Sequence, residues 1–332
     1  NDIVRKFIDM YAGRLRNQVS FMLSACNFYM PIFEEALDAY GLPLELRYLP
    51  IIESALNPSA VSRAGASGLW QFMISTGKIY GLESNSLVDE RRDPIKATWA
   101  AARYLKEMYD IYGDWNLVIA AYNCGPGTIN KAIRRANGET DYWKIYNYLP
   151  KETRGYVPAF IAANYVMTYY CDHNICPMET NIPASTDTVQ VNKNLHFEQI
   201  ADLCNVPLDQ IKSLNPQYKK QMIPGDSKPY TLRLPIDAIS NFIDKQDTIY
   251  VHRADELFRN RKTVAVKEIT PSTRKTTAAV AGKGKPTYYT IKSGDTLSTI
   301  AGKYGVTVKD IQRWNGMSNT KIAAGKRLKI YK

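Results

Sequence analysis

Two segments of the chain, 100 residues apart, repeat the same residue pattern. Each begins with a strand-like run (DTVQV or TYYTI), continues with two short amphipathic stretches and ends in another strand-like run (YTLRLP or KRLKIY). Agreement at so many positions predicts two copies of one βααβ module of roughly 45 residues. We define the first module as residues 186–236 and the second module as residues 287–332. The matched pairs are Ile200 and Ile300, Ala201 and Ala301, Val206 and Val306, Ile211 and Ile311, Asn215 and Asn315, and Gly225 and Gly325.

Residues 1–180 show one helical pattern after another and almost no strand pattern. The clearest is DPIKATWAAARYLKEMYDIYG, in which Asp93 suits an N-cap, Pro94 the first helical position and Gly113 a C-cap. A last helix is predicted over residues 152–170, with a kink at Pro158. The spacing of DPIKATWAAARYLKEMYDIYG predicts a buried face made of Ile95, Trp99, Ala102, Leu105, Tyr109 and Tyr112.

These patterns predict the fold class of the whole chain. We expect an α+β multidomain protein, in which an all-α domain over residues 1–180, with its core at about 41–170, precedes the two small modules. Residues 237–286 are predicted to be a connecting segment followed by a flexible basic linker, because residues 263–286 are small, polar and basic.

The net charge of +11 is concentrated near the C-terminal end. Residues 253–332 hold 18 Lys and Arg against 5 Asp and Glu, whereas residues 1–252 hold 25 against 27. A basic region suits an anionic polymer or surface, although a solvated face with a linker explains it equally well. No basic segment alternates with aromatic residues as a base-stacking groove does, so we expect no nucleic-acid partner.

No membrane span or cofactor is predicted. No apolar run approaches the roughly 20 residues that cross a bilayer, and we expect any export signal or membrane anchor to lie outside this chain. The five cysteines are odd in number and are not spaced like zinc ligands. Cys171 and Cys176 could close a small loop, or all five could be buried thiols. No motif for a metal or an organic cofactor is present.

Glu53 occupies one position of a leucine stripe that advances in steps of three and four. The pattern predicts one helix, ended by Asn57-Pro58, with Glu53 in its last turn. An apolar wall raises a carboxyl pKa, as a general acid working near neutral pH requires. Alternatively, Glu53 turns outward or pairs with Arg47 or Arg63. The leucines are Leu42, Leu46, Leu49 and Leu56.

The loop after Glu53, SAVSRAGASGLWQF, combines small residues that allow close backbone approach with hydrogen-bond donors and an aromatic plane. These features suit a polysaccharide cleft, but a tight turn with a core tryptophan has the same composition. The later segment AYNCGPG also allows two interpretations, since Tyr122 and Asn123 could line a site or cap a buried helix. Cleavage of a sugar chain ordinarily needs two carboxylates, and this region supplies one.

Together these segments resemble the lytic murein transglycosylases of the soluble-lytic-transglycosylase, goose-type-lysozyme-like superfamily. The matching features are Glu53-Ser54, Ser62, GASGLWQF and AAYNCGPG. The segments YGLESNSLVDERRDPIKAT and YLPKETRGYVP resemble the membrane-bound D-type branch. The second module, with YTIKSGDTLSTIAGKYGVTVKDIQRWNG, closely resembles a LysM module, and the first module is a degenerate copy without the Ser-Gly-Asp-Thr opening.

The resemblance implies a peptidoglycan-cleaving enzyme with one catalytic glutamate, Glu53. Glu53 would protonate the MurNAc–GlcNAc β-1,4 bond and then deprotonate the C6 hydroxyl, which leaves a 1,6-anhydro end without water. The resemblance further implies that Ser54 orients Glu53 and that the second module binds glycan. Because the first module departs from the LysM pattern, two roles stay open for it, glycan binding and structural docking. The residues implied in substrate binding are Ser54, Ser62, Gly68, Leu69, Trp70, Gln71, Tyr122, Asn123 and Tyr156 in the helical domain, and Gly294, Asp295, Thr296 and Ile322 in the second module.

Two other functions stay open at this point. A hydrolytic muramidase on the same fold would need a second acid, for which Asp89, Glu90 and Asp93 are the candidates. A non-catalytic wall-binding protein would use the LysM modules alone. For the leading interpretation we expect peptidoglycan strands as the partner, a monomer, and a location in the periplasm of the cell envelope, with membrane attachment only through an anchor outside this chain.

Overall fold

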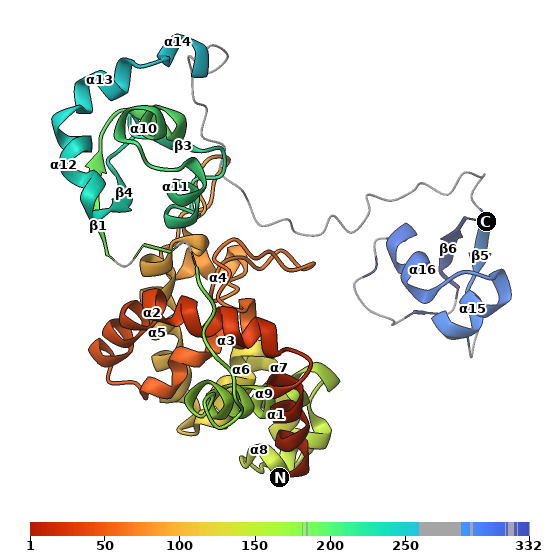
Figure 1. Ribbon diagram of the computed structural model, residues 1–332. Coiled ribbons are helices and arrows are strands. Elements are labelled where there is room, and N and C mark those ends of the chain that lie inside the picture. The colour runs from red at the N-terminus through yellow and green to blue at the C-terminus, as the bar shows by residue number, and fades with distance from the viewer. Residues whose placement is uncertain are drawn as a thin grey trace. The chain divides into compact units, whose positions relative to one another are not determined.

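The computed structural model describes residues 1–180, 182–183, 185–258, 287–292, 295–315, 317, 322–323 and 325–331 (Figure 1). The chain divides into two compact units, Asn1–Thr270 and Pro271–Lys332. The first unit contains the helical domain and the first module, and the second unit contains the second module. The predicted fold class is confirmed, while the linker predicted for residues 263–286 lies outside the described residues.

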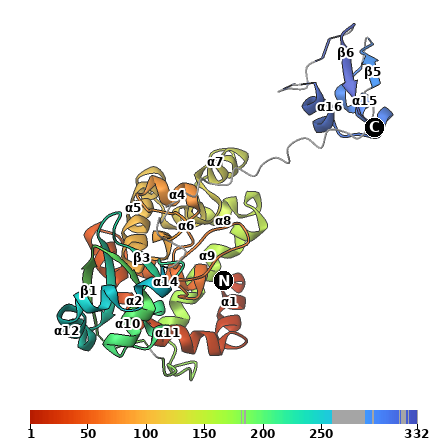
Figure 2. The same ribbon diagram turned by 90° about the horizontal axis from the view of Figure 1, so that it is seen from above.

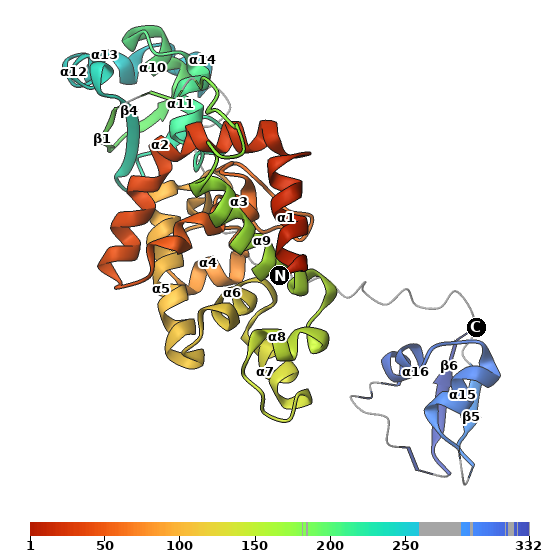
Figure 3. The same ribbon diagram turned by 60° about the horizontal axis from the view of Figure 1, so that its bottom comes forward.

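The centre of the helical domain is α6 (Trp115–Cys124), in which residues 117–121 are buried. Because these side chains are apolar all round, the helix is covered on several sides. Both α5 (Pro94–Tyr112) and α9 (Lys151–Thr168) pack against it, α1 (Asp2–Ala12) packs along α9, and α2 (Arg16–Ala39) packs along α5 (Figure 3). The remaining elements are η1 (Leu44–Tyr48), α3 (Leu49–Ser54), α4 (Ile74–Ile79), η2 (Glu90–Arg92), α7 (Pro126–Arg135), α8 (Tyr142–Ile145) and η3 (Tyr146–Tyr148).

The ends of α5 confirm the sequence prediction, but its buried face differs from the predicted one. The Asp93 side chain accepts hydrogen bonds from two backbone amides of the first turn, and Gly113 ends the helix in the left-handed conformation. Trp99 is 36% exposed and Ile95 37% exposed, although both were predicted to be buried. The alanines of the neighbouring stripe face the core instead, since small side chains let α2 and α6 approach closely.

Pro158 lies inside α9, which continues through it to Thr168. A proline has no amide proton, so the carbonyl of Arg154, four residues earlier, loses its helical donor. The buried Tyr142 hydroxyl donates to that carbonyl at 2.9 Å. A side chain from α8 thus supplies the hydrogen bond that the proline removes.

The first module is built from two antiparallel strand pairs and two helices. β1 (Thr186–Val191) pairs with β4 (Tyr230–Pro235), and β2 (Asn194–His196) pairs with β3 (Met222–Pro224). Between them lie α10 (Phe197–Cys204) and α11 (Leu208–Leu214). The segment predicted to be connecting forms α12 (Ile236–Asp244), α13 (Gln246–Val251) and α14 (Ala254–Leu257), and α12 and α13 pack on α10 (Figures 1 and 2).

The second module has the predicted βααβ order in its described residues. β5 (Thr287–Thr290) pairs antiparallel with β6 (Arg327–Ile330), and α15 (Leu297–Tyr304) and α16 (Val308–Trp314) lie between them in the chain. Ile300, Ile311 and Ile330 form its core. The repeat partners of Ile300 and Ile311 are buried in the first module as well.

The repeated asparagine makes the same contacts in both modules. Asn215 donates to the carbonyls of Ile211 (2.9 Å) and Arg233 (2.8 Å) and accepts from the Arg233 amide (2.8 Å). Asn315 donates to the carbonyls of Ile311 (2.8 Å) and Lys329 (2.8 Å) and accepts from the Lys329 amide (2.7 Å). The asparagine therefore joins the second helix to the last strand, which explains why both copies of the repeat contain it.

Three chemical features follow from the described ranges. None of their helices is both long and apolar enough to cross a membrane. No group of three or more His, Cys, Asp or Glu side chains within them is placed to hold a metal. All five cysteines are free thiols, and Cys171 and Cys176 are exposed rather than joined or buried.

Replacing Asn215 by alanine should destabilise the first unit. Asn215 is buried, and its loss leaves the Arg233 amide and two carbonyls without their partner, so the free energy of unfolding should fall by about 2–3 kcal/mol in urea unfolding. Ser213→Ala, at an exposed position on the same helix, is the matched control and should change it by less than about 0.5 kcal/mol. Equal stability of the two variants would contradict the bridging role of Asn215.

Candidate functional site

Glu53 lies at the end of α3, a helix shorter than the sequence predicts. The four stripe leucines are buried, as expected, but η1 and α3 are separate elements. Pro50 cannot donate to the carbonyl of Leu46, so the 3₁₀ helix ends and a new helix begins. The predicted end at Asn57-Pro58 is wrong, because Ala55 and Leu56 both have positive φ angles, of 51° and 58°.

Glu53 lines a pocket of about 420 Å³. Among the residues that surround it are Ser62 and Gln71, as the resemblance implies. Glu53 is the single carboxylate in the lining, which otherwise consists of apolar, hydroxyl and amide side chains. The remaining lining residues are Tyr11, Leu15, Gln18, Met22, Ile51, Ile52, Ser54, Ala55, Ala60 and Val61.

The Glu53 carboxyl has a protonation equilibrium near neutral pH. Burial raises its pKa to about 7, a hydrogen bond donated by the Tyr156 hydroxyl opposes the rise, and the charge of Glu152 adds to it. Tyr156 comes from α9, so the contact joins two segments 103 residues apart. Arg47, the predicted alternative partner of Glu53, pairs with Glu34 instead.

The side chains of Ser62 and Gln71 stabilise the loop SAVSRAGASGLWQF through hydrogen bonds within it. The Ser62 hydroxyl oxygen accepts from the Ala66 amide at 3.0 Å. Gln71 has a φ of 48°, which is unusual for a residue with a side chain. Its side-chain amide donates to the carbonyl of Gly68 at 2.8 Å. Both side chains are thus positioned by contacts within the loop, and both also line the pocket.

Ser54 joins α3 to this loop rather than contacting Glu53 directly. Its hydroxyl lies 2.9 Å from the carbonyl of Leu69 and 3.0 Å from the carbonyl of Pro50. From α6, the Tyr122 hydroxyl donates to the carbonyl of Trp70 at 2.7 Å. Asn123 accepts from Thr153 of α9 at 2.9 Å. The predicted site residues on α3, the loop, α6 and α9 are therefore linked by hydrogen bonds.

Leu69 and Trp70 are not among the residues that line the Glu53 pocket, and their part in substrate binding stays a prediction. Both side chains are fully buried, and the Trp70 indole donates to Thr98 at 2.9 Å. Gly68 has a different structural role, since a Cβ there would lie 1.7 Å from the carbonyl oxygen of Arg91. These three residues of the loop therefore fix its position through their backbone and through packing in the core.

The acids considered for a hydrolytic mechanism are engaged elsewhere. Asp89 is buried and forms two hydrogen bonds of 2.8 Å with Arg91. Glu90 is buried and pairs with Lys96 at 2.5 Å, while Asp93 caps α5. None of the three lines the Glu53 pocket.

Sequence reasoning missed Tyr11, Glu152 and Thr153. Tyr11 on α1 lines the pocket, and nothing in its local sequence distinguishes it from a core tyrosine. Glu152 and Thr153 belong to the segment YLPKETRGYVP, from which only Tyr156 was assigned a role. Position 152 lies one helical turn before Tyr156, a spacing that places both on one face of α9.

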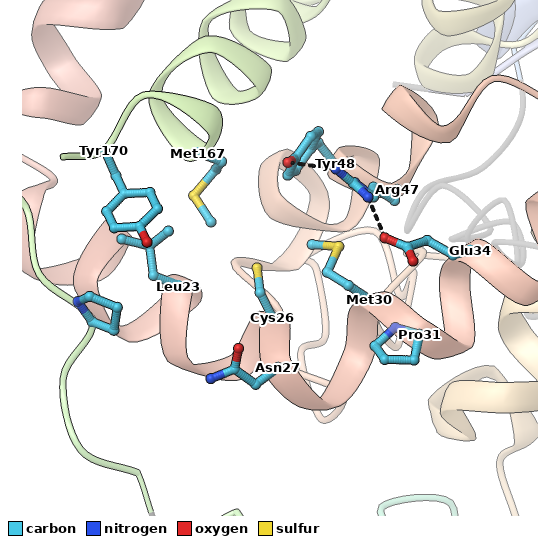
Figure 4. Close-up of a pocket in the computed structure, with 11 residues that line it drawn as sticks. Leu23, Cys26, Asn27, Met30, Pro31, Glu34, Arg47, Tyr48, Met167 and Tyr170 are labelled. Atoms are coloured by element: carbon cyan, nitrogen blue, oxygen red, sulfur yellow. Dashed lines mark hydrogen bonds and ion pairs between the residues drawn. The ribbon is translucent and has the colours of Figure 1, made fainter. Parts of the chain in front are cut away.

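A neighbouring pocket of about 430 Å³ has no comparable acid–base group (Figure 4). Arg47 and Glu34 form an ion pair at one side, and Met30 and Met167 project toward the middle. Burial raises the pKa of the Cys26 thiol to about 12, so the thiol stays protonated at neutral pH. No predicted site residue lines this pocket.

In the second module, two predicted binding residues also have structural roles. The Asp295 carboxylate accepts from the Tyr289 hydroxyl and the Lys292 amide, both at 2.8 Å. Thr296 caps α15. Ile322 packs against the core, and Gly294 lies outside the described residues.

Three family models match separate parts of the chain. Residues 30–145 match the transglycosylase SLT domain, residues 185–251 match the LysM-like domain of lytic transglycosylase MltD, and residues 289–330 match the LysM domain. The matches agree in order with the helical domain, the first module and the second module.

Two of the similar curated proteins come from Escherichia coli (strain K12). Membrane-bound lytic murein transglycosylase D is 33% identical over 294 residues, which is 87% of this chain and 60% of that protein. Soluble lytic murein transglycosylase is 32% identical over 124 residues, which is 36% of this chain and 19% of that protein. The solved structure of the soluble lytic transglycosylase SLT70 matches 43% of this chain and 24% of its own, with 29% identity and a TM-score of 0.38.

This chain spans about 60% of the length of the D-type relative. Its similarity to that relative runs through most of the chain, and all three domain matches fall in the order helical domain, first module and second module. The chain therefore contains a transglycosylase SLT domain, followed by a LysM-like domain of the MltD type and a LysM domain, and it is similar over most of its length to membrane-bound lytic murein transglycosylase D.

Proposed function

We propose that this chain is a peptidoglycan lytic transglycosylase that cleaves the β-1,4 bond between MurNAc and GlcNAc and leaves a 1,6-anhydro end. One observation carries the proposal: Glu53 has a pKa of about 7 and lines a pocket in which it is the single carboxylate. A carboxyl group with this pKa can act both as an acid and as a base near neutral pH.

In the first step Glu53 acts as a general acid. Its proton moves to the glycosidic oxygen, and the bond between that oxygen and C1 of MurNAc breaks, so the electron pair leaves with the GlcNAc hydroxyl. Burial makes this step possible near neutral pH, because it keeps the carboxyl protonated well above the usual carboxyl pKa.

In the second step the substrate supplies the nucleophile. The C6 hydroxyl oxygen attacks C1, and the Glu53 carboxylate accepts the proton of that hydroxyl, which restores the acid and consumes no water. Tyr156 donates to Glu53, so it stabilises the carboxylate formed between the steps. Substrate assistance of this kind replaces the second carboxylate of an ordinary glycosidase.

A hydrolytic muramidase is the second candidate, and Glu152 is the residue that favours it. Its charge raises the pKa of Glu53, and its side chain is exposed on α9. A second carboxylate near the acid could activate water, and the product would then carry a reducing end. The products therefore distinguish the two mechanisms.

The second module would hold the enzyme on its polymer. We place glycan binding at Asp295, Thr296 and Ile322, together with Gly294, which lies outside the described residues. A small module binds weakly, but a tether raises its effective concentration along a repetitive strand. A wall-binding protein without activity would retain the same module and release no soluble fragments.

The proposed substrate sets the proposed location. Peptidoglycan belongs to the cell envelope, and we place this chain on its periplasmic side. The relative of 33% identity is named membrane-bound, and on that name we propose an anchor for this protein too.

Glu53→Gln should abolish fragment release from purified peptidoglycan. The amide has no proton to give, so the rate should fall by at least about 10²-fold, and the anhydro products, lighter than hydrolysis products by one water, should disappear from the mass spectrum. Glu152→Gln is the matched control and should leave the products anhydro. Reducing ends from the parent, lost in Glu152→Gln, would establish hydrolysis instead.

The activity should fall as pH rises above about 7, since the ionised Glu53 cannot donate a proton. Tyr156→Phe removes the hydrogen bond that lowers the Glu53 pKa, so the alkaline limb of kcat/KM should move to higher pH while the maximal rate decreases. Rates of soluble fragment release from pH 5 to 9 measure both effects. An alkaline limb that stays in place or moves to lower pH would contradict the role given to Tyr156.

Deleting residues 286–332 should reduce retention on sedimented cell walls far more than turnover of short glycan fragments. The fragments reach the Glu53 pocket without the second module, whereas a long strand benefits from the tether. Retention by the full chain should also weaken with salt, because the C-terminal region is basic. Equal losses in both assays would contradict this division of roles.

A further inference from the structure

The first module contacts the helical domain through a segment that we call the docking segment (residues 82–92). Val88 forms a β-bridge with Tyr218, the Asp89 amide donates to the carbonyl of Gln217 at 2.9 Å, and the Lys219 amide donates to the carbonyl of Leu87 at 2.8 Å. The side chains of Leu87 and Val88 are buried in the core of the first module. A loop of the helical domain thus completes the core of its neighbour.

Polar contacts surround this junction. The Lys219 ammonium donates to the carbonyl of Asn85 at 2.7 Å. Lys228 pairs with Glu83 at 2.7 Å, and the Tyr230 hydroxyl donates to the same carboxylate at 3.1 Å. An apolar centre with a polar rim is the composition of a specific interface.

Arg91 connects the docking segment to the loop over the Glu53 pocket. Its guanidinium is buried and forms the two hydrogen bonds with Asp89 described above. Its Nη1 donates to the carbonyls of Gly65 (2.8 Å) and Phe72 (2.9 Å), which lie in the middle and at the end of the loop. Arg92 adds a hydrogen bond of 3.1 Å to Ser67.

The same loop makes the contacts that reach the acid. Gln71 lines the Glu53 pocket, the carbonyl of Leu69 accepts from Ser54, and the carbonyl of Trp70 accepts from Tyr122. A continuous series of contacts therefore runs from the first module through Asp89 and Arg91 to the residue next to Glu53.

In the first module, the positions that correspond to predicted glycan-binding residues of the second module are buried. By the repeat of 100 residues, Leu195 and Met222 stand where the second module has Asp295 and Ile322. Both are fully buried, and they belong to the paired strands β2 and β3. Gln199 on α10 donates to the carbonyl of His252 at 2.7 Å, so the chain after the module packs over it.

We propose that the first module is an internal brace for the catalytic loop rather than a glycan-binding module, and that Arg91 is the positioning residue through which it acts. Arg91 acts through the loop backbone and touches no reacting atom. Docking orders Asp89, the Asp89 carboxylate fixes the guanidinium, and the guanidinium holds the carbonyls of Gly65 and Phe72. The effect on rate rests on the proposed function, whereas the ordering of the loop does not.

Arg91→Lys in the full chain tests the connection, because lysine keeps the charge but cannot reproduce the fork that meets Asp89 and two carbonyls. We expect kcat on short glycan fragments to fall at least about tenfold with KM little changed, and hydrogen exchange at residues 65–72 to accelerate at least about tenfold. Arg103→Lys, in an exposed pair on α5, is the matched control and should change neither. Parental exchange in residues 65–72 of Arg91→Lys would overturn the proposal.

Val88→Ala tests the module's part at the interface itself. Removing two methyl groups from the module core should weaken docking, accelerate exchange in residues 65–72, lower kcat and leave retention on cell walls unchanged. Reduced retention would mean that the first module binds glycan, and faster exchange with parental kcat would mean that the loop needs no brace. If the parent itself releases no fragments, the proposed function fails, while the exchange data still decide whether the module orders the loop.

Discussion

The buried guanidinium of Arg91 is the interaction on which the first unit depends. Removing a guanidinium and a carboxylate from water is costly, and the cost is offset only when both groups find full hydrogen-bonding partners. Here Asp89 accepts two bonds and two loop carbonyls accept two more. The Arg91 side chain thereby joins the docking segment to residues 65–72, and the backbone of the docking segment in turn contacts the first module. A shift of either contact would leave buried polar groups unpaired.

The pKa of Glu53 depends on the side chains that pack around its carboxyl group. The stripe leucines are not among the residues that line the pocket, and the apolar lining comes from other residues, among them Leu15, Met22 and Ile51. Tyr11 of α1 lines the same pocket, and Tyr156 of α9 donates to the carboxylate. Burial raises the carboxyl pKa and the tyrosine hydrogen bond lowers it, and the balance near 7 depends on both. An acid that must later serve as a base needs this balance, because a pKa far from neutral would slow one of the two steps.

The local sequence was a good guide where one interaction dominates. The caps of α5 and the burial of the leucine stripe were predictable, since each depends on residues within a few turns. The buried face of α5 was not, because alanine and large apolar residues both recur at helical spacing and only the neighbouring helices decide which stripe is covered. Likewise, the loop tryptophan matched a sugar-binding plane in composition, and its contact with Thr98 and Phe33 makes it a core residue.

The amino-acid sequence was sufficient to predict a helical domain with one candidate acid, two modules of a repeat, and motifs that resemble a known family. Tertiary structure decided how these parts cooperate. It excluded Asp89, Glu90 and Asp93 from the pocket by giving each another partner, and it brought Glu152, Thr153 and Tyr11 close to the site. It also gave the first module a buried junction with the docking segment. The physical reason is that a local pattern specifies an element and its apolar face, whereas pKa values, ion pairs and docking depend on residues far apart in the chain.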